Sequence, residues 1–374
     1  MTTPFTVGEA EGRRPGFVPA SVTQTGTSMG AFVYHGPGRK RWEEVPKPVL
    51  LAPTDAIVRV DATTICDTDI RTVNGDVPAV TAGRILGHEA VGTIESVGSR
   101  VRNFAVGDRV LVSCITACGT CEFCLEGSHG RCIGGGGRLL GNTIDGTQAE
   151  FVRVPFAATS MFRVPPRVSD EQMLMLAELL PTGYEVGVLN GHVQPGDLVV
   201  VLGAGAVGLA AIVGSRLFSP AHIVAIDKSD RRLERAKGFG ADIAVNIERE
   251  DPLAIIRQLN GGLGADVTIE TVGEAAMFEL ATQLTRHRGH VANVESGGRP
   301  ADYLDDLWSL DMAITTGSVD TYSIPTLLRL TTGHQIDADR FVTHHLRLDQ
   351  FDDAYDIFSR SEETGALKVV LSRA

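Results

Sequence analysis

The stretch from Asp197 to Gly214 reads DLVVVLGAGAVGLAAIVG, and it decides how the C-terminal half of the chain folds. A run of aliphatic residues leads into a G-x-G-x-x-G pattern formed by Gly203, Gly205 and Gly208, and an apolar segment of helical length follows. The first glycine predicts a tight turn, the second a close approach of the backbone to a ligand, and the third close packing of helix on strand. We therefore expect a strand that turns into a helix whose N-terminus faces an anionic ligand.

Outward from this stretch, strand-like and helix-like segments alternate. After it come HIVAID, SDRRLERAKGFG, ADIAVN, DPLAIIRQL, ADVTIET, AAMFELATQL and GHVANV. Strand and helix repeated in this way predict an α/β fold with a doubly wound parallel sheet. Residues 30–180 differ, because they are dense in glycine, valine and short alternating runs, which is typical of an irregular β-rich domain.

Asp227 ends the second of these strands, nineteen residues after Gly208. A carboxylate there accepts hydrogen bonds from both hydroxyls of an adenosine ribose, and its charge repels a 2′-phosphate. The pattern therefore predicts NAD rather than NADP, with Ala206 and Val207 of the motif counted among the cofactor-binding residues. The alternative is a glycine turn followed by a surface aspartate, with no ligand.

Composition and charge exclude several classes of function. The 374 residues exceed the usual size of one hydrophobic core, so two domains are expected. A net charge of −12 argues against nucleic-acid partners and anionic membrane surfaces. No stretch has the roughly 20 apolar residues of a membrane helix. Residues 1–28 lack the apolar core of a secretory signal, so we expect a disordered extension and a cytoplasmic protein with reduced thiols.

Five of the six cysteines lie between Cys114 and Cys132. Cys118, Cys121, Cys124 and Cys132 have the spacing C-x2-C-x2-C-x7-C, which suits a closed tetrahedral zinc site of structural type. A thioredoxin-like redox pair does not account for the third and fourth cysteines. A nucleic-acid-binding finger disagrees with the acidic charge of the protein. Cys114 falls outside the spacing and is expected to be a small buried side chain.

A catalytic zinc needs a different set of residues that leaves one coordination position open. Cys66 lies at a strand end in TICDTDI, and His88 and Glu89 follow in GRILGHEAVG. Taken singly, each has an ordinary structural explanation, since a lone cysteine is usually part of the core and a GHE sequence is usually a hydrogen-bonded turn.

Taken together, these motifs resemble one family. From Met29 to Ala374 the chain is similar to the zinc-dependent alcohol dehydrogenases of the medium-chain dehydrogenase/reductase family. The segment GNTIDGTQAEFVRVP, from Gly141, resembles the bacterial branch that includes many secondary-alcohol dehydrogenases. The resemblance implies a GroES-like catalytic domain over residues 29–182, a Rossmann NAD-binding domain over 183–318, and a return to the catalytic domain over 319–374. It also implies a homodimer or homotetramer.

The same resemblance assigns site residues. Cys66, His88 and Glu178 would hold the catalytic zinc, with Glu89 as an additional or exchanging ligand, so that each chain would carry two zinc ions. Asp69 would orient the ring of His88 and fix its tautomer. Thr182 matches a threonine that contacts the cofactor in the family.

The activity implied is hydride transfer between an alcohol and NAD, which yields an aldehyde or a ketone. Thr68 resembles the hydroxyl that receives the proton of the alcohol. Many relatives carry a histidine five residues after the ligand cysteine, whereas this chain has Arg71, which does not deprotonate in proteins. Either water or Asp67 would then take the proton, and we hypothesise that Arg71 pairs with a cofactor phosphate. Glu295 also departs from the small residues of many relatives.

Alternatives remain at this level. A polyol or threonine-type zinc dehydrogenase has the same motifs and would differ in the polarity of its pocket. A nucleotide-binding sensor without turnover predicts a lost ligand or a lost relay hydroxyl, yet both are present. The same residues disfavour a zinc-free enone reductase.

Overall fold

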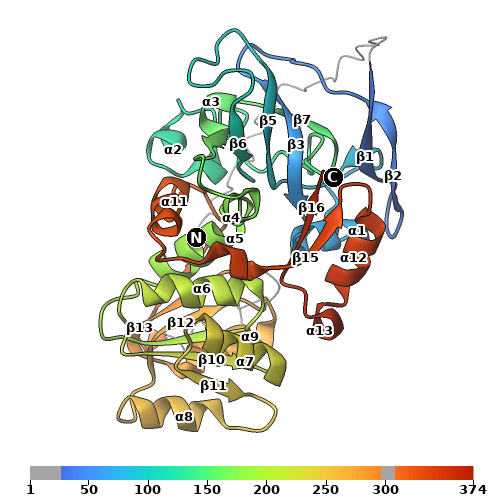
Figure 1. The fold of residues 1–374 in the computed structure, drawn as a ribbon. Coiled ribbons are helices and arrows are strands. Elements are labelled where there is room, and N and C mark those ends of the chain that lie inside the picture. The colour runs from blue at the N-terminus through green and yellow to red at the C-terminus, as the bar shows by residue number, and fades with distance from the viewer. Residues whose placement is uncertain (1–26, 296–307, 374) are drawn as a thin grey trace, which may run out of the picture.

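The computed structural model describes residues 27–295 and 308–373. Within them the chain forms two lobes, and its C-terminal segment returns to the lobe in which it began (Figure 1). The predicted disordered extension lies outside the described residues as far as residue 26, and Ser28 already begins the first strand. The domain boundaries inferred from the family resemblance stay a prediction.

One lobe contains the doubly wound sheet that the alternating segments predict. Its six parallel strands have the order β11-β10-β9-β12-β13-β14. Their bounds are β9 Leu198–Leu202, β10 His222–Asp227, β11 Ile243–Asn246, β12 Ala265–Glu270, β13 Thr285–Asn293 and β14 Ala313–Thr316. The helices between them are α6 Ala206–Arg216, α7 Asp230–Phe239, α8 Pro252–Leu259 and α9 Ala275–Leu284.

Alternate residues of β9 explain how the helices cover both faces of this sheet. Val199 and Val201 pack in one cluster with residues of α6 and α7, whereas Leu198 and Val200 pack in another with residues of α8 and α9. Because successive side chains of a strand point to opposite faces, a fully apolar strand needs a helical layer on each side. The continuous run LVVVL is therefore buried along its whole length.

The other lobe is built on antiparallel pairing. A seven-stranded sheet has the order β15-β16-β3-β5-β6-β8, with β7 paired to β3, and a three-stranded sheet has the order β2-β1-β4. The strands are β1 Ser28–Tyr34, β2 Lys40–Pro46, β3 Ala56–Thr64, β4 Arg84–Ile85, β5 Ala90–Val97, β6 Arg109–Val112, β7 Phe151–Val154, β8 Met161–Arg163, β15 Val342–Arg347 and β16 Lys368–Ser372.

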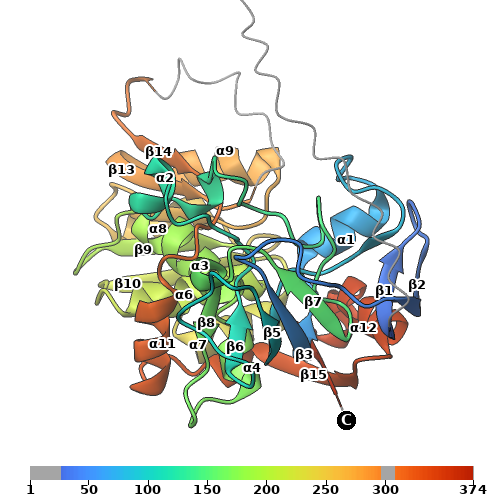
Figure 2. The ribbon, with the colours of Figure 1, turned by 90° about the horizontal axis from the view of Figure 1, so that it is seen from above.

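Short helices join and cover these strands or connect them to the parallel lobe, where two of them pack against α6. They are α1 Asp67–Asn74, α2 Glu122–Leu125, α3 Ala157–Ser160, α4 Asp170–Leu174, α5 Leu179–Pro181, α11 Ile324–Thr332, α12 Phe351–Ser359 and α13 Ser361–Thr364, with 3-10 turns η1 His129–Arg131 and η4 Ala338–Phe341 and a π-helix η2 Thr182–Leu189. The sheet strands β15 and β16 come from the returning C-terminal segment, which lies beside α1 in both ribbon views (Figures 1 and 2). The GroES-like and Rossmann fold class is confirmed.

One hydrophobic core runs through both lobes. Leu111 and Cys114 of the antiparallel lobe belong to the same buried cluster as Val199 and Leu209 of the parallel lobe and Ile324 of the returning segment. The lobes are therefore joined by packed apolar side chains as well as by the chain itself.

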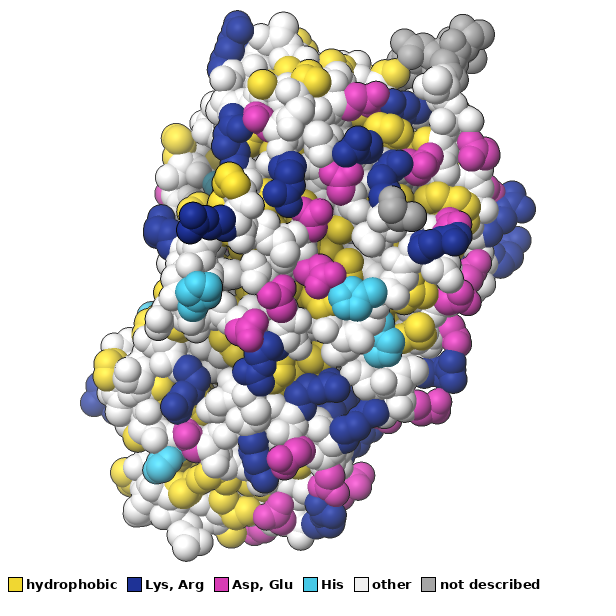
Figure 3. All heavy atoms as spheres, in the orientation of Figure 1, with side chains coloured by type: hydrophobic (Ala, Val, Ile, Leu, Met, Phe, Trp, Pro, Cys, Tyr) yellow, Lys and Arg dark blue, Asp and Glu magenta, His cyan; other side chains and the backbone are white. Residues whose placement is uncertain are grey.

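The surface carries charges of both signs. On the face shown in Figure 3, basic and acidic side chains are interspersed over both lobes. Among the helices of the described residues, none combines the length and the apolar character that a membrane crossing requires.

Candidate metal centres and cofactor cleft

The four predicted structural cysteines come together in one small loop structure. The sulfur atoms of Cys118, Cys121, Cys124 and Cys132 lie within 4.8 Å of one another. Helix α2 begins directly after Cys121, which brings Cys124 one turn further on back toward Cys118, and η1 leads the chain into Cys132. A Cβ at position 134 would lie 2.5 Å from the sulfur of Cys118, so glycine is needed there to leave room for the cluster.

The thiols of this cluster differ in proton affinity, because burial and the neighbouring thiols raise the pKa of Cys124 to about 12 whereas Cys118 is shifted the other way. Burial acts to raise the pKa of the Cys118 thiol, but hydrogen bonds from Thr120 and Cys121 outweigh it and lower this pKa to about 6. A thiolate is the form of cysteine that binds a metal. Four cysteine sulfurs within this distance of one another match a closed tetrathiolate zinc site.

The second predicted set also converges, from three separate segments of the chain. Cys66 is the N-cap of α1, His88 and Glu89 directly precede β5, and Glu178 directly precedes α5. One ligand atom from each of these four residues lies within 4.8 Å of the others. The Nε2 atom of His88 is 3.1 Å from Cys66 Sγ and 2.9 Å from Glu178 Oε2.

The crowding of these groups shifts their proton affinities. Burial raises the pKa of the Cys66 thiol to about 12, and the Glu178 carboxylate adds to this effect. Burial acts to lower the pKa of His88, but Cys66 and the carboxylates of Glu178 and Asp69 raise it well above its usual value. The thiol of Cys66 and the carboxylates of Glu89 and Glu178 are negative or potentially negative donors that lie around one point, so a cation there would balance their charge. A thiolate, an imidazole and a carboxylate form a donor set that suits zinc.

Glu89 lies close to the other three residues and also forms an ion pair. Its Oε1 atom lies 2.6 Å from Lys368 Nζ, and both side chains are almost completely buried. The other carboxylate oxygen of Glu89 is buried and has no hydrogen-bond partner among the described residues. An unpartnered buried carboxylate oxygen beside Cys66, His88 and Glu178 fits the predicted additional or exchanging role.

Asp69 lies behind His88, as the resemblance implied. Its Oδ1 atom is 3.8 Å from His88 Nδ1, and Oδ2 accepts hydrogen bonds from the backbone of Cys66 at 3.1 Å and from Gln148 at 3.2 Å. The hydroxyl of Tyr355 donates to Gln148 at 2.8 Å. Asp69 is thereby fixed between a ligand loop and two residues that were not predicted, Gln148 in the loop before β7 and Tyr355 in α12.

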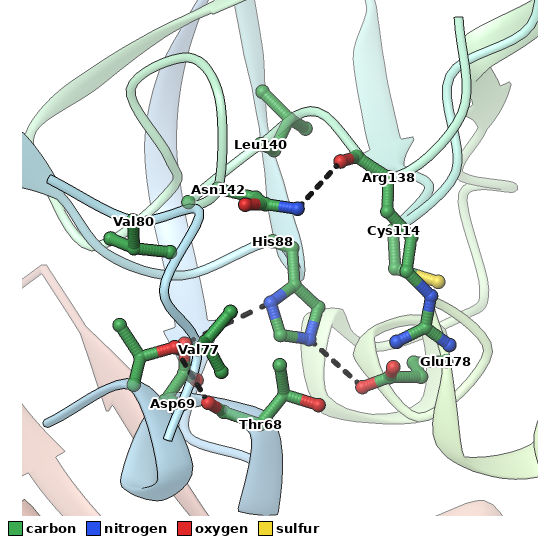
Figure 4. A pocket seen from close by; sticks show the side chains of 12 residues that line it. Thr68, Asp69, Val77, Val80, His88, Cys114, Arg138, Leu140, Asn142 and Glu178 are labelled. Atoms are coloured by element: carbon green, nitrogen blue, oxygen red, sulfur yellow. Dashed lines mark hydrogen bonds and ion pairs between the residues drawn. The ribbon is translucent and has the colours of Figure 1, made fainter. Parts of the chain in front are cut away.

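A small cavity opens beside His88 and Glu178 (Figure 4). Thr68 and Arg138 line this cavity and also the neighbouring cleft between the lobes. Asp67, Arg71 and Glu295 line the same cleft. Burial raises the pKa of Asp67 and raises that of Glu295 to about 7. The structure thus places both departures from the family pattern beside the predicted cofactor position.

The glycine motif lines an adjoining cleft, which shares Ala206, Val207 and Glu295 with the first. Gly203 has φ +92°, which only glycine adopts easily, and a Cβ at Gly208 would lie 1.9 Å from the carbonyl oxygen of Gly203. A Cβ at Gly205 would meet open space. Gly205 is the N-cap of α6 and offers no side-chain cap, so the first backbone N–H groups of this helix face the cleft free to bind an anion.

Asp227 and Thr182 also line these clefts. Asp227 is at the end of β10, where its oxygens accept hydrogen bonds from the backbone of Ala204 at 2.8 Å and Ser229 at 2.9 Å. Thr182 begins η2 and lines the cleft together with Ala206 and Val207. An open glycine cradle, a free helix N-terminus and a fixed carboxylate fit a dinucleotide.

Sequence reasoning missed residues that reach the site from far along the chain. Lys368 and Tyr355 come from the returning segment, and Gln148 and Arg138 come from the stretch after the cysteine loop. No spacing rule connects them to Cys66 or His88. The segment from Gly141 that carries Gln148 was singled out for its family resemblance, and that signal could have found Gln148.

Comparisons with known proteins agree with this geometry. Residues 52–166 match the family described as "alcohol dehydrogenase GroES-like domain", and residues 206–319 match the one described as "zinc-binding dehydrogenase". An alcohol dehydrogenase of Cupriavidus necator is 34% identical over 371 residues, with 92% of this chain and 98% of that protein covered.

Two solved structures extend the comparison. The apo form of zinc-dependent alcohol dehydrogenase 2 from Streptococcus pneumonia is 42% identical with a TM-score of 0.88, over 92% of this chain and 99% of that one. A protein described as a zinc-binding dehydrogenase from Sinorhizobium meliloti 1021, bound to NADP, is 25% identical with a TM-score of 0.81, over 93% and 100%.

Proposed function

This chain belongs to the zinc-type alcohol dehydrogenases of the medium-chain dehydrogenase/reductase family, and from that premise we propose that it transfers hydride between an alcohol and NAD. The products would be a ketone, when the alcohol is secondary, or an aldehyde. The observation that carries the proposal is a single cleft, lined on one side by Cys66 and Glu178 and on the other by Ala206 and Val207. Metal ligands and a dinucleotide cradle thus share one space.

Cys66, His88 and Glu178 would hold a catalytic zinc, with Glu89 available as a further ligand. When bound, zinc supplies Lewis acidity, which lowers the pKa of an alcohol and polarises a carbonyl. Cys118, Cys121, Cys124 and Cys132 would hold a second, structural zinc. Two further residues support the ligands. Asp69 orients His88, and Lys368 forms an ion pair with Glu89, which leaves Glu89 available as an additional ligand.

Thr68 is the proposed proton acceptor. It lies on α1 two residues after Cys66, lines both the cavity and the cleft, and is only partly buried. A hydroxyl can receive one proton while it gives up its own. The next group along the cleft is Asp67, which also lines the cofactor wall and can take the proton onward to solvent.

NAD would be held by the other wall and accepts the hydride when bound. The N-terminus of α6 would bind the pyrophosphate, and Asp227 the adenosine ribose. Arg71 is exposed in the cleft and would pair with a phosphate. An Arg71→Ala variant should bind NAD more weakly, and an unchanged dissociation constant would remove this assignment.

A cytoplasmic location and a homodimeric or homotetrameric assembly are part of the same proposal. They rest on the family membership, and size-exclusion chromatography with light scattering tests the assembly directly.

The experiment that tests the function combines metal analysis with turnover. The purified protein should contain two zinc ions per chain and should reduce NAD in the presence of members of a panel of primary, secondary and polyol alcohols and threonine. Cys66→Ser should lower the zinc content to one per chain and abolish turnover. One zinc per parent chain with no turnover on the panel would instead support a nucleotide-binding sensor.

A further inference from the structure

Arg138 brings a positive charge to the cavity beside the proposed catalytic metal ligands. Its side chain lines the cavity that His88 and Glu178 border, and it is the one lysine or arginine among the described residues that do so. Apolar side chains such as Val77, Val80 and Leu140 form much of the remaining wall (Figure 4). Arg138 is nevertheless an exposed residue, so its guanidinium is accessible to a ligand that enters the cavity.

The structure gives this guanidinium no partner of its own. Within the described residues it forms no hydrogen bond and no ion pair, although Figure 4 shows it extended toward the carboxylate of Glu178. Burial acts to lower the pKa of Arg138, but the charges of Glu178, Cys114 and Cys66 outweigh it and raise this pKa. Arg138 is therefore a permanent cation that feels the metal-ligand cluster without being bound to it.

The backbone around Arg138 is fixed, so its position is built into the fold. Gly137 pairs with Thr116 through two backbone hydrogen bonds of 2.6 and 3.0 Å. On the other side, the amide of Asn142 donates to the carbonyl oxygen of Arg138 at 3.3 Å. Both ends of the segment are tied to the lobe that carries the cysteine loop, which prepositions the side chain at the cavity wall.

No carboxylate at the site is bound to Arg138. A thiolate at Cys66 and a carboxylate at Glu178 together match the two charges of a zinc ion, and Glu89 is matched by Lys368. Asp69 lines the cavity, Asp67 lines the cleft and Glu295 interacts with Arg138 across it, but within the described residues none of these three forms an ion pair with Arg138. A ligand that enters the cavity can therefore supply an anion that binds Arg138.

We propose that Arg138 is a specificity-determining residue that binds an anionic group, a carboxylate or a phosphate, carried by the substrate alcohol. The inference rests on the proposed function and names the class of substrate: a hydroxy acid or a phosphorylated alcohol. Guanidinium groups bind carboxylates and phosphates through two parallel hydrogen bonds, which also orients the bound molecule. Arg138 would thereby hold the far end of the substrate while the hydroxyl faces His88 and Glu178.

The first test compares three matched substrates of the zinc-loaded enzyme with NAD. These are 1-butanol, 4-hydroxybutyrate and the monophosphate of 1,4-butanediol, which share a four-carbon chain and differ in the charge at its end. The parent should oxidise at least one anionic substrate with a higher kcat/KM than 1-butanol. Arg138→Gln should reduce that kcat/KM by about 10- to 100-fold, mostly through KM, because a charge-assisted hydrogen bond is lost.

The control is Arg102→Gln, which removes the same charge from an exposed position outside the cavity and the cleft. It should change none of the three values by more than about threefold. Arg138→Lys keeps the positive charge but cannot donate two parallel hydrogen bonds, so its kcat/KM should lie between those of Arg138→Gln and the parent. The anionic substrate whose kcat/KM falls in Arg138→Gln shows whether Arg138 prefers a carboxylate or a phosphate.

A second test uses binding without turnover. Calorimetric titration of butyrate and of inorganic phosphate into the zinc-loaded protein with NAD should give an affinity for one of the anions that Arg138→Gln weakens at least tenfold. If the parent oxidises no alcohol but this Arg138-dependent binding remains, the anion site stands and the proposed function fails. If the parent has a higher kcat/KM for 1-butanol than for both anionic substrates, the inference is wrong. It is also wrong if Arg138→Gln lowers the activity on all three substrates equally together with the zinc content, because Arg138 then acts only by stabilising the carboxylate of Glu178.

Discussion

Glu295 is a carboxylate at the edge of the cofactor cleft whose ionisation costs stability. Burial raises its pKa from 4.5 to about 7, and Asp67 and Glu178 add to the rise against Arg138 and Arg71. Because the folded protein holds this proton more tightly than the unfolded chain does, the contribution of the protonated group is complete below pH 4.5. It is lost as the pH rises through about 7.

Glu295→Gln should therefore stabilise the protein in a pH-dependent way. The gain in unfolding free energy should be near zero at pH 4.5 and should increase to at most about 3 kcal/mol above pH 8, since one pKa unit corresponds to about 1.4 kcal/mol. Urea denaturation at pH values from 5 to 8.5 measures it, with the exposed Glu126→Gln as a control for the loss of one negative charge. A gain independent of pH would contradict the assignment.

At the residue level, the sequence predicted those site residues that belong to local motifs. The four loop cysteines have short spacings within one loop, so their spacing alone predicted a metal site. Cys66, His88 and Glu178 lie far apart in the sequence and needed the family resemblance. Lys368 and Arg138 could not be predicted, since their approach to the site depends on how β16 and the stretch after the cysteine loop pack, and no periodicity records that packing.

The π-helix η2 carries an element-scale feature that no sequence pattern indicated. Glu185 is buried within it, and its carboxylate accepts hydrogen bonds from the backbone of Asp320 at 2.9 Å, Thr321 at 3.0 Å and Ser323 at 2.8 Å. The carboxylate of Glu185 thus accepts the backbone hydrogen bonds that a neighbouring strand would otherwise accept, in the segment that leads from the parallel sheet into α11. The same segment supplies Gly317 and Val319 to the cleft.

Glu185→Ala should cost about 3–5 kcal/mol of unfolding free energy, because three backbone N–H groups would lose their acceptor. Glu185→Gln should cost less, since its amide oxygen can still accept from Asp320 and Thr321 while its NH₂ group faces Ser323. Chemical denaturation of both variants gives the comparison. Equal stability of the alanine variant and the parent would show that water replaces the carboxylate at no cost.

The sequence predicted the sheet elements better than it predicted the helices around the cleft. The aliphatic runs of β9, β10 and β12 are long enough to be unambiguous, and their alternation with helices specifies a parallel order. In contrast, the short α5 ends at Pro181 and the π-helix η2 begins at the next residue, so the helical path continues past a proline and through Gly183. Their geometry is set by packing against α6 rather than by local propensity.

On the scale of the whole molecule, the core that joins the lobes decides how the protein unfolds. Leu111 and Cys114 lie on one side of this core, Val199 and Leu209 on the other, and all are buried. Neither lobe can unfold without exposing apolar surface of its partner, and each exposed Å² costs about 25 cal/mol. Two lobes that share a core should behave as one cooperative unit.

Scanning calorimetry of the zinc-loaded protein should therefore give a single transition whose calorimetric and van't Hoff enthalpies agree. NAD at a concentration of 100 times its Kd should stabilise the whole protein by about 2.7 kcal/mol, although it would bind mainly to the parallel lobe. Zinc release from the cysteine loop, followed with a chromophoric chelator, reports on the unfolding of the antiparallel lobe. With NAD, the midpoint temperature of this release should rise by as many degrees as the midpoint of the calorimetric transition. Zinc release that ignores NAD, or a second calorimetric transition, would mean that the lobes unfold separately and that the shared core does not couple them.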